Sequence, residues 1–194
     1  MRHALRLVRS GRCAGAVSCG NTGAWLVSSV LELGNLESVE RPAIASVLPR
    51  SDGGRLVLMD AGANVDCKPE HLASFARLGS VYAAALGVSN PRVGLLSNGE
   101  EDTKGNLQVR ATLPLLRSLD LNMVGPIEPS AAMSGACDVL ICDGFVGNVL
   151  LKAAEGAVQT VVTLLREEIE RRATGKLGAF LLRGAFRRFR TRVA

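Results

Sequence analysis

Residues 141–156 read ICDGFVGNVLLKAAEG, a stretch that joins an apolar strand to a helix through a glycine-rich bend. Its polar and small positions are Asp143, Gly144, Gly147, Asn148 and Lys152. Lys152 follows Asn148 by four residues, so both lie on one helix face. Backbone N–H groups at a helix start attract anions, and the stretch therefore predicts a phosphate cradle. A capped helix with a Lys that reaches solvent is the alternative, because the spacing is not that of a P-loop.

The rest of the chain repeats this alternation of short apolar runs with segments of helical periodicity. Strands are predicted at 13–18, 43–49, 55–60, 92–97, 121–125 and 137–143, and helices at 24–34, 69–87, 106–119 and about 147–172. The SDGG segment at 51–54 predicts a hairpin, and Pro114 is expected to kink or shorten its helix. Strands of this kind, separated by helices, indicate a mostly parallel, mixed sheet covered on both faces. In such folds ligands bind beyond the carboxyl ends of the strands.

The composition is that of one folded domain or of one lobe of a larger protein. The chain has 194 residues, of which 47% are hydrophobic and 21% are charged. No stretch approaches the roughly 20 apolar residues of a membrane span, and the basic N-terminus lacks the apolar run of a signal peptide. The five cysteines form no CxxC pair and no zinc-ligand spacing, so we expect buried thiols in a reducing cytoplasm. No metal ion and no cofactor is expected.

Two further loops that follow predicted strands are rich in glycine and polar residues. SCGNTGA (18–24) offers Gly20, Asn21, Thr22 and Gly23 at a helix start, and LLSNGEEDTKGN (95–106) offers Asn98, Gly99, Glu100, Glu101, Lys104 and Gly105. The first could equally be an ordinary glycine turn with an N-cap, and the second a solvated charged loop. Taken together at one edge of one sheet, the three loops predict a cleft that binds phosphate or a phosphorylated ligand.

The net charge of +5 is concentrated at the C-terminal end. Residues 176–194, KLGAFLLRGAFRRFRTRVA, contain six basic residues and no acidic residue. Their spacing predicts a basic amphipathic helix, distinct from an α/β domain at 1–175. Such a helix is typical of a membrane-surface contact or of docking to an acidic protein, with Arg183, Arg187 and Arg190 as contacts. Packing against the protein itself is the alternative. Nucleic-acid binding is not expected, because no aromatic residues line the polar face.

Five motifs, in this order along the chain, resemble those of the PlsX family of phosphate acyltransferases in bacterial phospholipid synthesis. They are VSCGNTGAWL (17–26), RPAIASVLP (41–49), DAGANVDCKPEHLASFARLGSVYA (60–83), PRVGLLSNGEEDTKGN (91–106) and DVLICDGFVGNVLLKAAEG (138–156). The resemblance implies a three-layer α/β/α sandwich related to phosphotransacetylases and isopropylmalate dehydrogenases. It also implies an enzyme, usually dimeric, that transfers a fatty acyl group from acyl carrier protein to inorganic phosphate. We expect it in the cytoplasm, with the basic tail as a peripheral contact to anionic membrane.

The implied chemistry gives roles to the residues of the three loops. Lys104, Asn148, Lys152 and Asp143 would be the catalytic residues, and Gly20, Asn21, Thr22, Gly23, Asn98, Gly99, Glu100, Gly144 and Gly147 would hold phosphate and the oxyanion. Glu100, Glu101 and Asp143 are expected to pair with a lysine or to orient backbone donors. Since the leaving thiol has a pKa of about 8.5, a strong general acid is not needed.

The chain departs from the family pattern in two respects. In GPIEPSAA (125–132), Pro126, Ser130 and Ala131 stand where the family usually has Asn, Arg and Asp. The family's N-terminal and C-terminal parts also have no counterpart here, so we expect an interior fragment that is weakly active or inactive. Two alternatives remain open at this point: an enzyme of the phosphotransacetylase type that uses acyl-coenzyme A, and a non-catalytic module that binds carrier protein or membrane.

Overall fold

The fold is built on a five-stranded sheet with the strand order β1-β2-β5-β3-β4. The computed structural model describes residues 1–171 and 173–193, without the side chains of residues 173, 176, 177 and 190–193. The strands are β1 (Ala45–Pro49), β2 (Arg55–Met59), β3 (Val93–Leu96), β4 (Met123–Ile127) and β5 (Val139–Ile141). β1 runs antiparallel to β2, and all other pairs are parallel. The predicted hairpin and mixed sheet are therefore confirmed.

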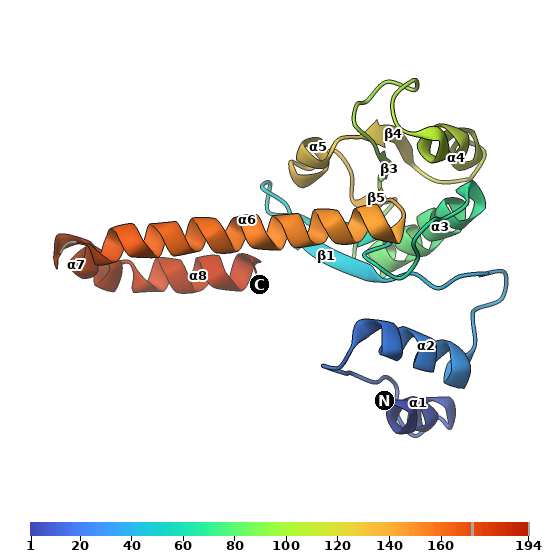
Figure 1. Ribbon diagram of the computed structural model, residues 1–194, viewed down its shortest axis with the longest axis horizontal. Helices are drawn as coiled ribbons and strands as arrows, with labels where there is room; N and C mark the ends of the chain where they lie inside the picture. Colours follow the sequence, from blue (N-terminus) through green and yellow to red (C-terminus); the bar gives the residue numbers. More distant parts are fainter. Residues whose placement is uncertain (172, 194) are drawn as a thin grey trace.

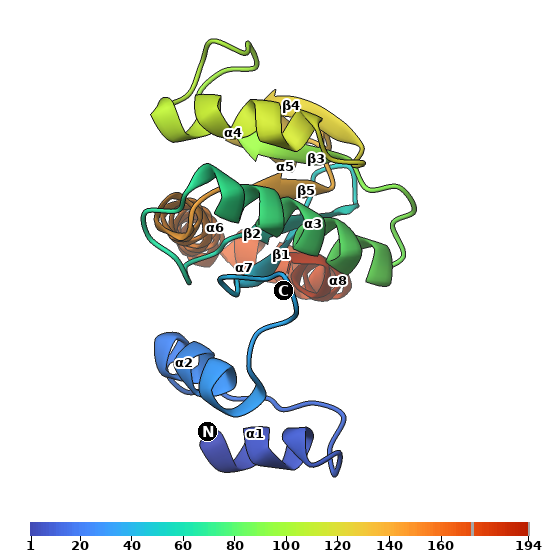
Figure 2. The ribbon, with the colours of Figure 1, turned by 90° about the vertical axis from the view of Figure 1, so that its right-hand side faces the viewer.

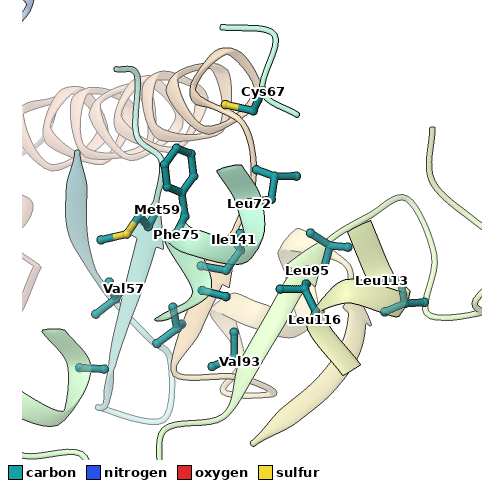
Figure 3. Packing of buried hydrophobic residues seen from close by; sticks show 13 residues of the cluster. Val57, Met59, Cys67, Leu72, Phe75, Val93, Leu95, Leu113, Leu116 and Ile141 are labelled. Atoms are coloured by element: carbon teal, nitrogen blue, oxygen red, sulfur yellow. The ribbon is translucent and has the colours of Figure 1, made fainter. Parts of the chain in front are cut away.

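Helices cover both faces of this sheet, which gives the expected three-layer α/β/α arrangement (Figures 1 and 2). α3 (Pro69–Ala85) and α4 (Leu107–Arg117) lie on one face, and α5 (Pro129–Met133) and α6 (Gly144–Glu170) lie on the other. Figure 3 shows Phe75 and Leu72 of α3 over Met59 and Ile141 of the sheet. Leu56, Leu58 and Leu140 point to the opposite face, because neighbouring strand residues alternate. The two cores thus share the same strands.

Most predicted elements are present, with shifted ends. α6 begins at Gly144 rather than near Gly147, because the carboxylate of Asp143 caps it by accepting from the Val146 N–H at 2.9 Å. Pro114 lies inside α4, which ends three residues later at Arg117. The short helix α5 was not predicted; it begins with a proline in its first turn, directly after β4.

The N-terminal segment departs most from the prediction. α1 (Arg2–Arg9) packs on α2 (Thr22–Leu33), where Glu32 pairs with Arg2 and Arg6. Figures 1 and 2 show this pair apart from the sheet. The helix expected at 24–34 is confirmed, but the strand expected at 13–18 is wrong: these residues form irregular backbone, and Val17 is 98% exposed. A short apolar run becomes a strand only when a neighbouring strand completes its hydrogen bonds.

The basic tail forms two helices instead of the expected single one. α7 (Ala173–Leu181) and α8 (Arg183–Val193) are separated at Leu182, and Gly178 and Gly184 on either side lower the helix propensity there. α8 turns back from α7 toward β1, with which it is in contact (Figure 1). Within the described residues, no helix combines the length and the apolar character needed to cross a lipid bilayer.

A buried carboxylate ties together the ends of the strands opposite to the polar loops. Asp138, just before β5, accepts from Arg50 Nη1 at 2.6 Å, from Arg92 Nε at 3.0 Å and from the Arg92 backbone N–H at 2.9 Å. Burial alone would raise the pKa of Asp138, but the hydrogen bonds from Arg92 and Arg50 outweigh burial and lower the pKa to about 2.

We expect this carboxylate to make the free energy of unfolding depend on pH. Its folded pKa lies below the unfolded value of about 3.9, so its contribution, about 2 kcal/mol, is complete above pH 4 and is lost as the pH falls toward 2. Asp138→Asn should cost about 3 kcal/mol at pH 7, because Arg92 loses its carboxylate partner and Arg50 keeps only Asp52. Urea unfolding between pH 7 and pH 2.5 measures both effects.

The control variant is Asp102→Asn, which breaks the exposed ion pair between Asp102 and Arg117. Exposed pairs contribute about 0.5 kcal/mol, so this variant should unfold nearly as the parent does. Equal losses in the two variants would show that the Asp138 cluster has no special role.

Candidate functional site

A cleft lies at the carboxyl ends of β3 and β5, where the sheet topology brings two loops together. It consists of two adjoining cavities: the α6 cavity, of about 700 Å³, which extends along α6 (Gly144–Glu170), and a second cavity of about 730 Å³ beside it. Both cavities are lined by Asn106, Gln108, Asp143 and Val146, which are at or near the starts of α4 and α6. The prediction of a site at this edge of the sheet therefore agrees with the position of the main cavities.

One wall of the α6 cavity is apolar. α6 contributes Val146, Val149, Leu150 and Ala153, whose spacing of three and four residues places them on one helix face. The opposite side is formed by Leu72, Leu95, Leu96 and Val109. This wall starts at the first turn of α6 and follows the helix away from the strand ends. It can accommodate an aliphatic chain but offers nothing to a charged group.

The other edge of the cleft is polar and is organised around the start of α4. The side chain of Asn106 caps the helix by accepting from the Val109 N–H at 2.9 Å. Asn98 Oδ1 accepts from the Gly105 N–H at 2.8 Å and so closes the loop that precedes the helix. The cap is a neutral amide, so the positive end of the helix dipole is not neutralised by the cap itself. Asp143 lines both cavities and Asp66 lines the second, so an anion at the first turn of α4 would share the cleft with carboxylates.

The start of α6 is already occupied by the protein's own groups. The carboxylate of Asp143 accepts from the Val146 N–H, and the N–H of Gly144 donates to the carbonyl oxygen of Asn64 at 2.7 Å. A phosphate here would meet a negative side chain and a donor that is already used. The alternative interpretation, a capped helix, therefore describes this end of α6 better than the phosphate cradle does.

Gly147 has a packing role in this structure. A Cβ atom on this residue would lie 1.8 Å from the carbonyl oxygen of Asp60. Asp60 is fully buried and accepts hydrogen bonds on both oxygens. Its donors are the N–H groups of Ile44, Gly62, Ala63 and Asn64 and the side-chain amide of Asn64. This carboxylate fixes the loop on which α6 is seated.

The structure brings together only part of the predicted site. Asn98 and Asp143 line the α6 cavity, whereas Lys104 and Lys152 are exposed and line neither cavity. Lys152 pairs with Glu155 at 2.8 Å instead of with Glu100, Glu101 or Asp143, and Asn148 lies against Gly62. Gly99 and Glu100 belong to the loop beside the cleft, and neither lines a cavity.

The predicted phosphate loop at 20–23 is located elsewhere. Asn21 caps α2 by accepting from the Ala24 N–H, and Gly20 lies against Met1 at the packed pair of α1 and α2. Gly20, Asn21, Thr22 and Gly23 therefore contribute nothing to the cleft at the strand ends in this structure. The ordinary glycine turn with an N-cap describes what is observed.

Several lining residues were not predicted from the sequence. The α6 cavity is lined by Ser97, Asn106 and Gln108. Gln108 Nε2 also donates to the carbonyl oxygen of Cys67. Asn106 could have been found, because an Asn just before a helical segment is a capping signal. Gln108 carries no such signal, since only the rotation of α4 turns it toward the cleft.

The cleft offers neither a thiolate nucleophile nor a metal site. Burial raises the pKa of Cys142, which lines the α6 cavity, and also the pKa of nearby Cys67. Both thiols therefore stay protonated near neutral pH. Over residues 1–171 and 173–193, no group of His, Cys, Asp and Glu side chains is arranged to bind a metal ion.

Comparison with known proteins gives a consistent family. The model of the fatty acid synthesis protein family matches residues 1–194. The chain is 48% identical over 194 residues to a phosphate acyltransferase of Trichlorobacter lovleyi, covering all of this chain and 56% of that protein. It is 51% identical over 185 residues to a phosphate acyltransferase of Aquifex aeolicus, covering 95% of this chain and 55% of that protein. The chain thus spans about half the length of the curated relatives it matches.

Two solved structures with the same fold are a phosphotransacetylase and a branched-chain phosphotransacylase. A phosphotransacetylase from Streptococcus pyogenes aligns with a TM-score of 0.64 at 18% identity, over 81% of this chain and 55% of that one. A branched-chain phosphotransacylase from Enterococcus faecalis aligns with a TM-score of 0.57 at 18% identity, over 78% of this chain and 62% of that one. These likenesses confirm the α/β fold class.

We expect Gly147→Ala to destabilise the chain, because α6 must move away from the Asp60 carbonyl to make room for the methyl group. Overpacking of this kind costs about 2 kcal/mol. The control is Gly156→Ala in the same helix, where a Cβ atom meets nothing within 4 Å. That variant should gain about 0.7 kcal/mol from helix propensity. Urea unfolding compares them, and a loss in both variants would contradict the packing argument.

Proposed function

The chain belongs to the fatty acid synthesis protein family, together with the bacterial phosphate acyltransferases, and we propose that its cleft serves the transfer of a fatty acyl group from acyl carrier protein to inorganic phosphate. One observation carries this proposal. The same cleft joins an apolar wall along α6 to a polar edge at the start of α4. A fatty acyl thioester and a phosphate are the two kinds of group that such a cleft accommodates.

The reaction needs positioning more than it needs a protein nucleophile. An oxygen of hydrogen phosphate attacks the thioester carbonyl carbon, the carbon–sulfur bond breaks, and the proton of the phosphate ends on the departing thiolate. Since that thiol has a pKa of about 8.5, it leaves without strong acid assistance. Holding the reacting atoms about 3–3.5 Å apart removes much of the entropic barrier. The protonated state of Cys142 agrees with direct attack.

The polar edge supports phosphate at the first turn of α4. There the backbone N–H groups that precede the first helical hydrogen bond point toward the cleft end of the helix, and Asn106 is a neutral cap. Lys104 lies two residues before Asn106 and adds a positive charge nearby. In this proposal Lys104 attracts phosphate toward the cleft, and Lys152 has no direct role because Glu155 pairs with it.

The apolar wall supports the acyl chain. Val146, Val149, Leu150 and Ala153 extend the apolar surface along α6 for about two turns. Burial of methylene groups against such a wall contributes about 0.8 kcal/mol for each group. A long acyl donor should therefore bind more tightly than a short one. A phosphotransacetylase-type enzyme that takes acetyl-coenzyme A would not need this wall.

The tail supports a peripheral contact with an anionic membrane or with the acidic carrier protein. Phe180, Leu181 and Leu182 are 61%, 72% and 56% exposed where α7 turns into α8. Arg183 lies 4.9 Å from the ring of Phe180 and places a positive charge beside this apolar corner. Arg187 is on the same helix, and the side chain of Arg190 is outside the described residues. Apolar groups next to arginines are typical of helices that bind at lipid surfaces.

A homodimer is also part of the proposal. Val158, Val161, Val162, Leu164 and Leu165 are all between 44% and 63% exposed along the middle of α6. Apolar side chains grouped in this way on one element favour contact with another protein surface. A second copy of the chain, packed through α6, would cover them.

The test of the acyl site uses two alanines one helical turn apart. Ala153 lines the α6 cavity, and Ala157 lines neither cavity. We expect Ala153→Asp to weaken binding of palmitoyl-acyl carrier protein at least tenfold, because a carboxylate has to be buried beside the acyl chain. Ala157→Asp should bind as the parent does. Acyl phosphate formation with palmitoyl-acyl carrier protein, palmitoyl-coenzyme A and acetyl-coenzyme A then identifies the donor. Preferential use of acetyl-coenzyme A would contradict the proposal.

The membrane contact is tested by co-sedimentation with vesicles that contain anionic phosphatidylglycerol. The triple variant with Phe180, Leu181 and Leu182 replaced by Ser should lose most of its binding, since the buried apolar area is removed. Binding of the parent should fall as salt is raised and should be weak on neutral phosphatidylcholine vesicles. Equal sedimentation of the parent and the triple variant would remove the apolar corner from the proposal.

A further inference from the structure

A buried hydroxyl without a partner stands at the junction between the apolar wall and the polar edge of the cleft. Among the side chains that the structure describes, two buried polar atoms make no hydrogen bond: Ser97 Oγ and His71 Nε2. The His71 atom lies 3.3 Å from a carboxylate oxygen of Glu40, so it faces a possible partner. Ser97 is 8% exposed, and no protein group faces its hydroxyl at hydrogen-bond distance.

The position of Ser97 is fixed by the sheet. It directly follows β3, and its backbone N–H donates to the carbonyl oxygen of Ile127 at 3.0 Å, which continues the parallel ladder with β4. Ser97 lines the α6 cavity, with Leu95 and Leu96 before it and Asn98 after it. A rigid strand end therefore holds the hydroxyl at the place where a bound acyl chain would meet the polar edge.

An orphaned hydroxyl at such a place has a physical cost. Burying a hydroxyl group without a hydrogen-bond partner destabilises the folded protein, and native structures seldom keep such a group without a role. Gly105 borders this hydroxyl, because a Cβ atom there would lie 3.3 Å from Ser97 Oγ. The loop that ends at Gly105 is closed by the bond between Asn98 and the Gly105 N–H. Ser97 therefore lies between this closed loop and the cavity that it lines.

We propose that the Ser97 hydroxyl donates a hydrogen bond to the carbonyl oxygen of the acyl thioester and to the oxyanion that forms from it. This inference rests on the proposed function of the cleft. As the phosphate oxygen bonds to the carbonyl carbon, negative charge gathers on the carbonyl oxygen. The carbonyl double bond forms again when the carbon–sulfur bond breaks, and the departing thiolate takes up the proton of the phosphate. A donor already aimed at that oxygen lowers the barrier without reorganising.

The proposal is tested first without turnover, by infrared difference spectroscopy of bound palmitoyl-acyl carrier protein that carries a ¹³C label in the thioester carbonyl. A hydrogen bond lowers the carbonyl stretching frequency. We expect the lowered band in the parent chain, its loss in Ser97→Ala, and partial retention in Ser97→Cys, because a thiol is a weaker donor. Thr112→Val is the control, since it removes a buried hydroxyl that already donates to the carbonyl oxygen of Gln108.

Stability and kinetics give a second, independent measurement. Ser97→Ala should raise the urea midpoint of unfolding, because it removes a buried unpaired group, and should lower kcat tenfold to about a hundredfold. The KM for phosphate should stay unchanged. A merely structural serine would behave in the opposite way, with lower stability and little effect on kcat. A higher KM for phosphate at unchanged kcat would place the hydroxyl on phosphate and overturn the proposal.

The outcomes separate this inference from the proposed function. If the parent forms no acyl phosphate but shows a lowered carbonyl band that depends on Ser97, the catalytic function fails and the assignment of Ser97 holds. If acyl phosphate forms and the band is the same in Ser97→Ala, the assignment of Ser97 fails alone. If palmitoyl-acyl carrier protein does not bind, both fail.

Discussion

The cleft depends on a single buried carboxylate that holds one loop in place. Asp60 accepts hydrogen bonds from four backbone N–H groups and from the side-chain amide of Asn64, and so fixes the turn after β2. The carbonyl oxygen of Asn64 in this loop accepts from the N–H of Gly144, and Gly147 packs directly on the backbone of Asp60. The position and rotation of α6 follow from these contacts. A helix seated in this way presents Val146, Val149 and Ala153 to the cleft.

The same seating explains which site residues could be predicted from sequence and which could not. The strand ends were predicted, because apolar runs followed by Asn98 and Asp143 are visible in the sequence. Lys152 was expected in the site because it follows Asn148 by one helical turn, but both residues lie on a face that turns away from the cleft. Spacing shows that two residues share a helix face. It does not show which face meets the sheet, since tertiary packing sets that rotation.

The fold itself was largely predictable, and the two exceptions have different causes. The five strands of the sheet and the helices α2, α3, α4 and α6 correspond to predicted segments. The run at 13–18 resembles the others in composition but has no neighbouring strand in this structure, so its apolar residues stay exposed. The tail has the periodicity of one helix, yet glycines on both sides of Leu182 allow it to turn back. Interactions distant in sequence decided the first case, and the local glycines decided the second.

The two ends of the parallel strands have different tasks. At one end Asp138 joins Arg50 and Arg92 in a fully paired cluster that secures the starts of β3 and β5. At the other end Asp60 is also fully bonded, but the hydroxyl of Ser97 is left without a partner. The edge of the sheet that carries the cleft thus keeps one polar group that the fold alone does not need.

The length of α6 sets a fixed separation within the molecule. Its 27 residues span about 40 Å, from the mouth of the cleft to the turn into α7. A continuous helix does not shorten, so in the proposed membrane contact the length of α6 would separate a lipid headgroup at the corner near Phe180 from the start of α4. Under that proposal, the phosphate that reaches the start of α4 would come from solution and not from the bilayer.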